Sequence, residues 1–102
     1  MQQPFNNLTP AEAERLAMLA EECGEVVKVV GKILRHGYNS HHPDTPYFSN
    51  LAKLEAEVRD IFAVHWAMVE QGDVSALGDM ESVAPKIWAR KLQYTHHQED
   101  GE

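Results

Sequence analysis

Residues 9–37, TPAEAERLAMLAEECGEVVKVVGKILRHG, decide the fold of this chain. They open with Thr9, Pro10 and Glu12, which place a hydroxyl at the N-cap, proline at the first helical position and glutamate at the third. Apolar residues then recur at three- and four-residue steps: Leu16, Leu19, Ala20, Cys23, Val26, Val27, Val30, Ile33 and Leu34. Because Gly37 follows two basic residues, it is a suitable C-cap, and the stretch predicts one long helix.

The remainder of the chain predicts two further helices and no strand. Residues 37–48 contain two prolines and several turn formers, so we expect a loop. Ser49 can cap a second helix that ends near Gly72, and its apolar side carries Leu51, Leu54, Val58, Ile61, Phe62, His65, Met68 and Val69. After a short turn or helix near residues 74–78, we expect a third helix at roughly 80–95, with a proline in or near its first turn.

These elements predict an all-α helical bundle of two long helices and a C-terminal helix. The chain of 102 residues is long enough for one domain, residues 1–102, with flexible ends at about 1–8 and 96–102. Helical chains this short often complete their core by association. We therefore expect a homo-oligomer, either a dimer or a tetramer.

Charge and cysteine content narrow the classes of partner and compartment. Nine basic and 16 acidic residues give a formal charge of −7, which argues against binding a nucleic acid polymer and suits metal cations. The single cysteine, Cys23, fits a reducing cytosol and lies among apolar helical neighbours, so we expect it to be buried. The sequence contains no leader and no apolar run long enough to span a bilayer, so we expect a cytoplasmic protein without membrane contact.

Two carboxylate pairs lie on the two long helices. Glu22 and Glu25 are three residues apart, as are Glu57 and Asp60, and side chains at this spacing are neighbours on a helix surface. Each pair adjoins apolar positions, so the four carboxylates converge if both apolar sides face one core. The negative charges of such neighbouring carboxylates repel one another unless a cation is present. Hard cations such as Mg²⁺ prefer oxygen ligands. The alternative, that these acids form ordinary solvated helix faces, stays open at this point.

The motifs resemble those of the all-α nucleoside triphosphate pyrophosphohydrolases, the MazG-like group. The resemblance rests on Glu21-Glu22-x-x-Glu25 followed by Glu57-x-x-Asp60. The lead-in at residues 15–22 is also similar, and the run GKILRHG at 31–37 resembles phage and prophage members. The likeness is good over about residues 12–72 and loose in the C-terminal helix.

The resemblance implies an activity and roles for the acids. Members are helical homo-oligomers that hydrolyse (d)NTPs to the monophosphate and pyrophosphate with Mg²⁺, for which Mn²⁺ could substitute. By this likeness Glu22, Glu25, Glu57 and Asp60 would bind the metal ion. Glu21 would be a further acid that touches a second ion or orients the attacking water.

Two features depart from the family pattern without removing a ligand. The 31 residues between Glu25 and Glu57 are a long connection (57 − 25 − 1), and Arg59 stands where many relatives have glycine. A long connection can shape the nucleotide pocket, so base specificity does not follow from the resemblance.

Basic residues supply candidates for contact with the substrate. Lys28, Lys32 and Arg35 continue the helix beyond Glu25, and His36 follows them into the loop. They could neutralise phosphates, as Lys and Arg do in phosphoryl-transfer sites, or could be solvated, with Lys28 paired to a nearby glutamate. Two more candidates, which could serve a neighbouring subunit, lie one turn apart on the last helix: Lys86 and Arg90.

Other function classes fit the motifs less well. A di-iron carboxylate bundle needs Glu-x-x-His pairs, whereas the third residue after Glu22 and after Glu57 is again an acid. Zinc is disfavoured because the sequence has no His-x-x-x-His spacing and only one cysteine. A non-catalytic helical interaction module with solvated acidic faces remains the alternative to the pyrophosphohydrolase.

Overall fold

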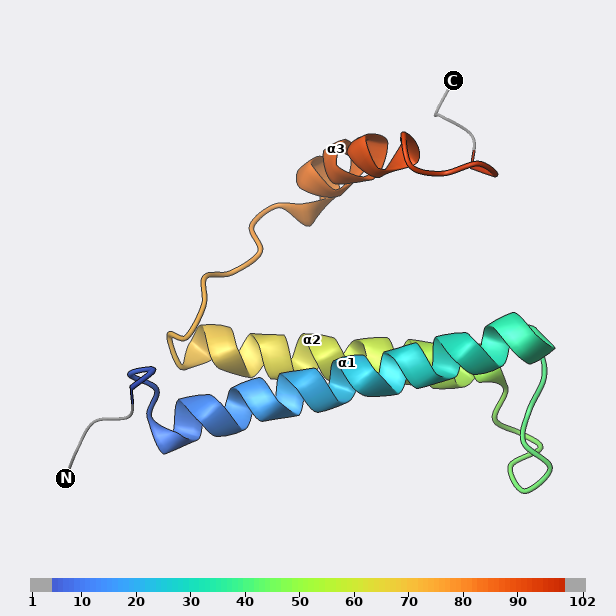
Figure 1. Cartoon of the computed structure of the whole chain (residues 1–102), viewed down its shortest axis with the longest axis horizontal. Helices are drawn as coiled ribbons and strands as arrows, with labels where there is room; N and C mark the ends of the chain where they lie inside the picture. Colours follow the sequence, from blue (N-terminus) through green and yellow to red (C-terminus); the bar gives the residue numbers. More distant parts are fainter. Residues whose placement is uncertain (1–4, 99–102) are drawn as a thin grey trace.

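The chain is all-helical, as predicted. A computed structural model describes residues 5–98 and contains three helices in this range: α1 (Pro10–His36), α2 (Asn50–Glu70) and α3 (Met80–Leu92) (Figure 1). No strand occurs among these residues, and an isolated bridge joins His41 to Ser49. The expected flexible ends lie partly outside the described residues, which exclude 1–4 and 99–102.

The predicted capping signals fix both ends of α1. The Thr9 hydroxyl accepts a hydrogen bond from the Glu12 N–H at 3.1 Å, and the Glu12 carboxylate accepts one from the Thr9 N–H at 2.9 Å. Gly37 has φ 88°, a conformation that glycine adopts without steric cost, and its N–H donates to the Ile33 carbonyl. The predicted bounds of this helix are confirmed.

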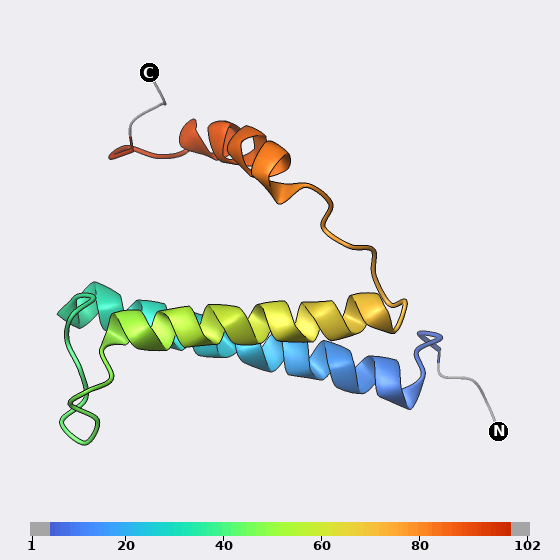
Figure 2. The ribbon, with the colours of Figure 1, turned by 180° about the vertical axis from the view of Figure 1, so that it is seen from behind.

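Helix α2 runs back along α1 to form an antiparallel hairpin. Ser49 caps α2 as predicted, since its hydroxyl accepts from the Ala52 N–H at 3.1 Å. Seen from behind, α2 lies along the length of α1, and the loop between them closes one end of the pair (Figure 2). At the opposite end, the Arg15 guanidinium of α1 forms two hydrogen bonds to the carboxylate of Asp73, just beyond α2.

The buried seam of the hairpin differs from the predicted apolar stripe. Val29, Val64 and Met68 are buried, and half-buried residues continue the seam at heptad-like steps: Leu19, Glu22, Val26 and Ile33 on α1, and Leu54, Glu57 and Ile61 on α2. Val27 and Leu34, which the sequence placed in the stripe, are 72% and 82% exposed. Cys23 is also exposed, so the prediction of a buried thiol is wrong. Apolar residues occur around much of α1, and periodicity alone could not select the face that α2 covers.

Helix α3 stands apart from the hairpin. Within the described chain it packs against neither α1 nor α2, and residues 75–79 form an irregular connection instead of the predicted turn or helix (Figure 1). Its observed end is Leu92, and Pro85 lies in its second turn, further inside than expected. The radius of gyration is 17.8 Å, against about 13 Å for a compact domain of this length. None of the helices in the described range is both long and apolar enough to cross a membrane.

Candidate metal centre

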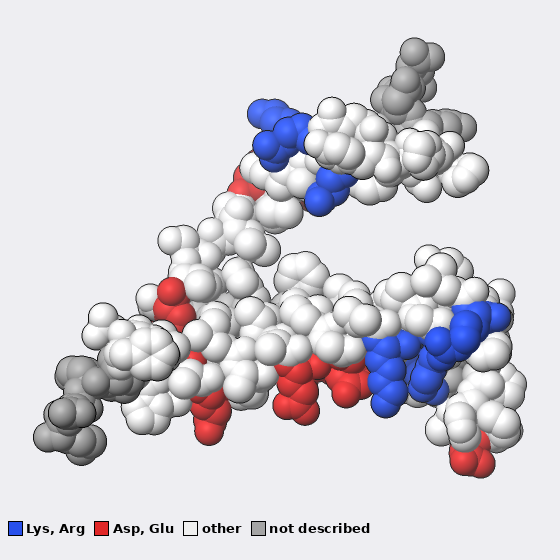
Figure 3. Space-filling model, in the orientation of Figure 1, with Lys and Arg blue, Asp and Glu red and all other residues white. Residues whose placement is uncertain are grey.

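Three carboxylates from the two long helices meet at the middle of the hairpin. Glu22 of α1 and Glu57 and Asp60 of α2 each offer an oxygen, and these atoms all lie within 4.8 Å of one another. Glu22 and Glu57 are half-buried, whereas Asp60 is exposed. Figure 3 shows acidic side chains gathered midway along the hairpin. The arrangement therefore has an inner pair of ligand groups and an open, solvent-facing side.

The heptad-like packing of the hairpin places these acids. Glu22 occupies a seam position between Leu19 and Val26, and Glu57 has the equivalent position on α2. Seam positions normally hold apolar residues, because a buried carboxylate loses hydration. Two glutamates in this place are costly for packing, which distinguishes them from solvated surface acids.

The electrostatics of Glu22 reflect this environment. Partial burial raises the pKa of Glu22, and the negative charges of Asp60, Glu57, Glu21 and Glu25 raise it further. A divalent cation would reverse this effect by neutralising the cluster. The ligand atoms of this group are all carboxylate oxygens, which suit Mg²⁺ or Mn²⁺. The group contains no thiolate and no imidazole.

The other two predicted acids lie beside this group and are not part of it. Glu25 is half-buried and Glu21 is exposed, and neither belongs to the set whose oxygens lie within 4.8 Å. Both still contribute to the raised pKa of Glu22. The structure thus brings together three of the four predicted metal ligands and leaves Glu25 and Glu21 as neighbours.

A basic pocket lies at the loop end of the hairpin. Its volume is about 310 Å³, and its lining includes three of the predicted substrate contacts, Lys32, Arg35 and His36. Basic side chains lie beside the acidic ones on this face (Figure 3). Sequence reasoning missed Lys53, which also lines the pocket. Its position one turn before Glu57 was the available signal.

Three predicted substrate contacts lie outside this pocket. Lys28 is exposed on α1, and among the described residues it forms no ion pair with Glu21 or Glu25. Lys86 and Arg90 belong to α3, which packs against neither helix of the hairpin, so they are not brought to the carboxylates within one chain. Figure 3 shows the basic side chains of α3 apart from those of the hairpin.

Comparison of the chain with protein-family models, curated proteins and solved structures finds no match. The resemblance to the MazG-like group therefore rests on the two carboxylate motifs and their surroundings. The structure adds one observation of its own, the convergence of Glu22, Glu57 and Asp60.

Proposed function

We propose that this protein hydrolyses nucleoside or deoxynucleoside triphosphates to the monophosphate and pyrophosphate, with Mg²⁺ as cofactor. The observation that carries the proposal is the convergence of Glu22, Glu57 and Asp60 from two helices at a partly buried seam. The raised pKa of Glu22 adds support, because the cluster is unfavourable as a set of free carboxylates.

The three convergent carboxylates, Glu22, Glu57 and Asp60, would hold the metal ion. Glu25, one helical turn after Glu22 on α1, is the fourth ligand that the resemblance implies. When bound, Mg²⁺ would bind phosphate oxygens, activate water and neutralise developing charge. Mn²⁺, which accepts the same oxygen donors, would substitute for it. The exposed side at Asp60 leaves room for a phosphate chain to approach.

The remaining groups of the chain would position substrate and water. Glu21 would accept a hydrogen bond from the attacking water and take up its proton as the new oxygen–phosphorus bond forms. The bond that breaks joins the nucleoside monophosphate to the two outer phosphates, which leave as pyrophosphate. Lys28, Lys32, Arg35 and His36 would offset the charge of the phosphates that the metal does not reach.

We further propose that the working form is a homo-oligomer in the cytoplasm. The single chain exposes 8512 Å², whereas a compact monomer of 11.5 kDa exposes about 5800 Å². Exposed apolar side chains occur on all three helices, including Val27 on α1, Phe62 on α2 and Trp88 on α3. Association would cover this surface and would allow Lys86 and Arg90 to reach the carboxylates of another subunit.

The same apolar surface favours one alternative, a non-catalytic helical interaction module. In that case the acidic cluster would have no specific affinity for Mg²⁺ and no catalytic role. A di-iron site receives no support, because the three convergent groups are all carboxylates and include no imidazole.

The decisive experiment measures pyrophosphate release from a panel of canonical and modified (d)NTPs, with Mg²⁺ and with EDTA. We expect metal-dependent release by the wild type and its loss in Asp60→Ala. Glu70→Ala, which removes an exposed acid at the end of α2, is the matched control and should keep full activity. A folded wild type that releases no pyrophosphate from any substrate would favour the interaction module.

A further inference from the structure

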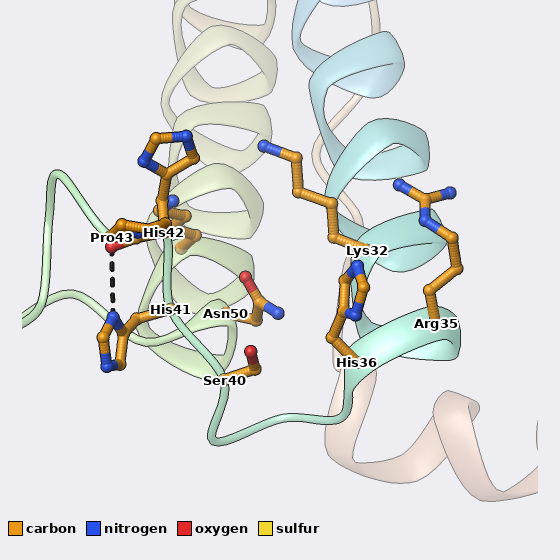
Figure 4. A pocket seen from close by; sticks show the side chains of 9 residues that line it. Lys32, Arg35, His36, Ser40, His41, His42, Pro43 and Asn50 are labelled. Carbon is orange, nitrogen blue, oxygen red and sulfur yellow. Dashed lines mark hydrogen bonds between the residues drawn. The ribbon is translucent and has the colours of Figure 1, made fainter.

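The pocket at the loop end of the hairpin concentrates positive charge. The C-terminal end of α1, the connecting loop and the first turn of α2 form it, and its lining includes three permanent cations, Lys32, Arg35 and Lys53. No carboxylate lines it. In Figure 4 the Lys32 side chain projects from α1 toward α2, and His36 and Asn50 face the same space. Such a pocket suits an anion that carries several charges.

Hydrogen bonds hold the walls of the pocket in place. Asn50 is 4% exposed, and its side-chain amide donates to the Gly37 carbonyl at 3.2 Å. The Asn50 N–H donates to the Ser40 carbonyl at 2.8 Å, so the loop is fastened to both helices. The His41 Nδ1 donates to the His42 carbonyl at 3.1 Å (Figure 4). A pocket that is already ordered loses little conformational freedom when it binds a ligand.

The ring of His42 is held so that it can donate to an anion. Its Nδ1 accepts a hydrogen bond from the Asp44 N–H at 3.1 Å, so the neutral ring carries its proton on Nε2. The Asp44 carboxylate is also 3.5 Å from Nδ1, but the shorter backbone contact determines the tautomer. His42 therefore adds an N–H donor to the cations of the pocket.

The pocket continues the face that carries the candidate metal centre. Lys32 follows Glu25 by seven residues, and Asp60 follows Lys53 by seven. Seven residues are about two helical turns, so these residues share a face and their backbones lie about 10 Å apart along the axis. The flexible lysine side chains shorten this gap. A phosphate chain held at the carboxylates can therefore extend toward the loop.

We propose that this pocket binds the β- and γ-phosphates of the substrate, and that it selects triphosphates over diphosphates. This inference rests on the proposed function. It fixes the direction of the substrate: the leaving pyrophosphate lies at the loop end, and the nucleoside lies on the side of the N-terminal half of α1. A diphosphate would lack the outer phosphate that reaches the pocket cations.

Binding of inorganic pyrophosphate, measured by titration calorimetry in EDTA, tests the pocket without any catalysis. We expect binding by the wild type and a loss of about tenfold or more in affinity in the Lys32→Gln/Arg35→Gln double variant, since each removed contact is a charge-assisted hydrogen bond. Lys91→Gln, a cation of α3 that does not line the pocket, is the matched control and should bind like the wild type. Thermal melts establish that all variants are folded. Equal affinities in the wild type and the double variant, or no binding by the wild type, would overturn the proposal.

Turnover measurements separate this proposal from the proposed function. The ratio of kcat/KM for a triphosphate to that for its diphosphate should fall in the double variant and stay unchanged in Lys91→Gln. An active double variant with an unchanged ratio would refute the selectivity role while the hydrolase assignment stands. A wild type that binds pyrophosphate through these cations but hydrolyses nothing would refute the hydrolase assignment and retain the pocket as a pyrophosphate site.

Discussion

The guanidinium of Arg15 forms a bidentate salt bridge with the carboxylate of Asp73 across the open end of the α1–α2 hairpin. Arg15 Nε donates to one Asp73 oxygen at 2.6 Å, and Arg15 Nη2 donates to the other at 2.9 Å. The two side chains are 20% and 12% exposed. This two-point contact joins residues 58 positions apart and fixes the place where the chain leaves α2 toward α3.

Breaking this pair should destabilise the hairpin. We expect Asp73→Asn to lower the melting temperature clearly, because the variant leaves the Arg15 charge half-buried without its partner. Glu55→Gln is the control, since the Glu55–Arg59 pair is exposed with a 4.0 Å separation, and we expect it to melt like the wild type. Equal effects of the two substitutions would contradict a structural role for Asp73.

The same pair predicts a loss of stability in acid. The hydrogen bonds from Arg15 hold the pKa of Asp73 below its ordinary value of 3.8. A carboxyl whose pKa is lowered by folding stabilises the fold above that ordinary value, and this contribution is lost as the pH falls through the lower, folded value. The difference in unfolding free energy between wild type and Asp73→Asn should therefore shrink below pH 3.8.

Glu22 should act in the opposite direction when no metal is bound. Its pKa is raised from the ordinary value of 4.5 by partial burial and by neighbouring acids. The stabilisation by its protonated form is fully present below pH 4.5 and is lost as the pH rises through the folded pKa. In EDTA at neutral pH, Glu22→Gln should therefore raise the melting temperature. A lower melting temperature in this variant would argue that the charged Glu22 side chain does not destabilise the folded state.

Mg²⁺ should stabilise the wild type through the same cluster. A ligand that binds only the folded state stabilises it by about 2.7 kcal/mol at a hundredfold excess over its dissociation constant. We expect a rise in melting temperature on adding Mg²⁺, absent in Glu57→Gln and kept in Glu70→Gln, an acid outside the cluster. A shift of the same size in all three proteins would indicate nonspecific binding.

The seam of the hairpin predicts which apolar residues stabilise a single chain. Met68 is 2% exposed, so Met68→Ala should lower the unfolding free energy by about 2–5 kcal/mol at any protein concentration. Leu34 is 82% exposed, so Leu34→Ala should change chain stability by less than about 0.5 kcal/mol. Any larger effect of Leu34→Ala should appear as weaker association, measured by sedimentation or light scattering across a dilution series.

The sequence by itself determined the helices and the chemical character of the candidate centre. Thr9 with Glu12, Gly37 and Ser49 bound the helices through hydrogen bonds to nearby backbone, and such local contacts can be read from neighbouring residues. The spacing of Glu57 and Asp60 also required only helical geometry, so their proximity was predictable.

Tertiary structure alone decided which faces and which distant residues meet. Apolar residues occur around much of α1, so only the register with α2 selected Val29 and left Val27 exposed. The same register brought Glu22, and not Glu25, into the group with Glu57 and Asp60. It also placed Lys53 in the lining of the pocket that Lys32 lines. These contacts cross between helices, where a rotation of one helix about its axis changes every partner without changing local propensity or capping. Local hydrogen bonds therefore fixed the elements, whereas interhelical packing assembled the candidate site.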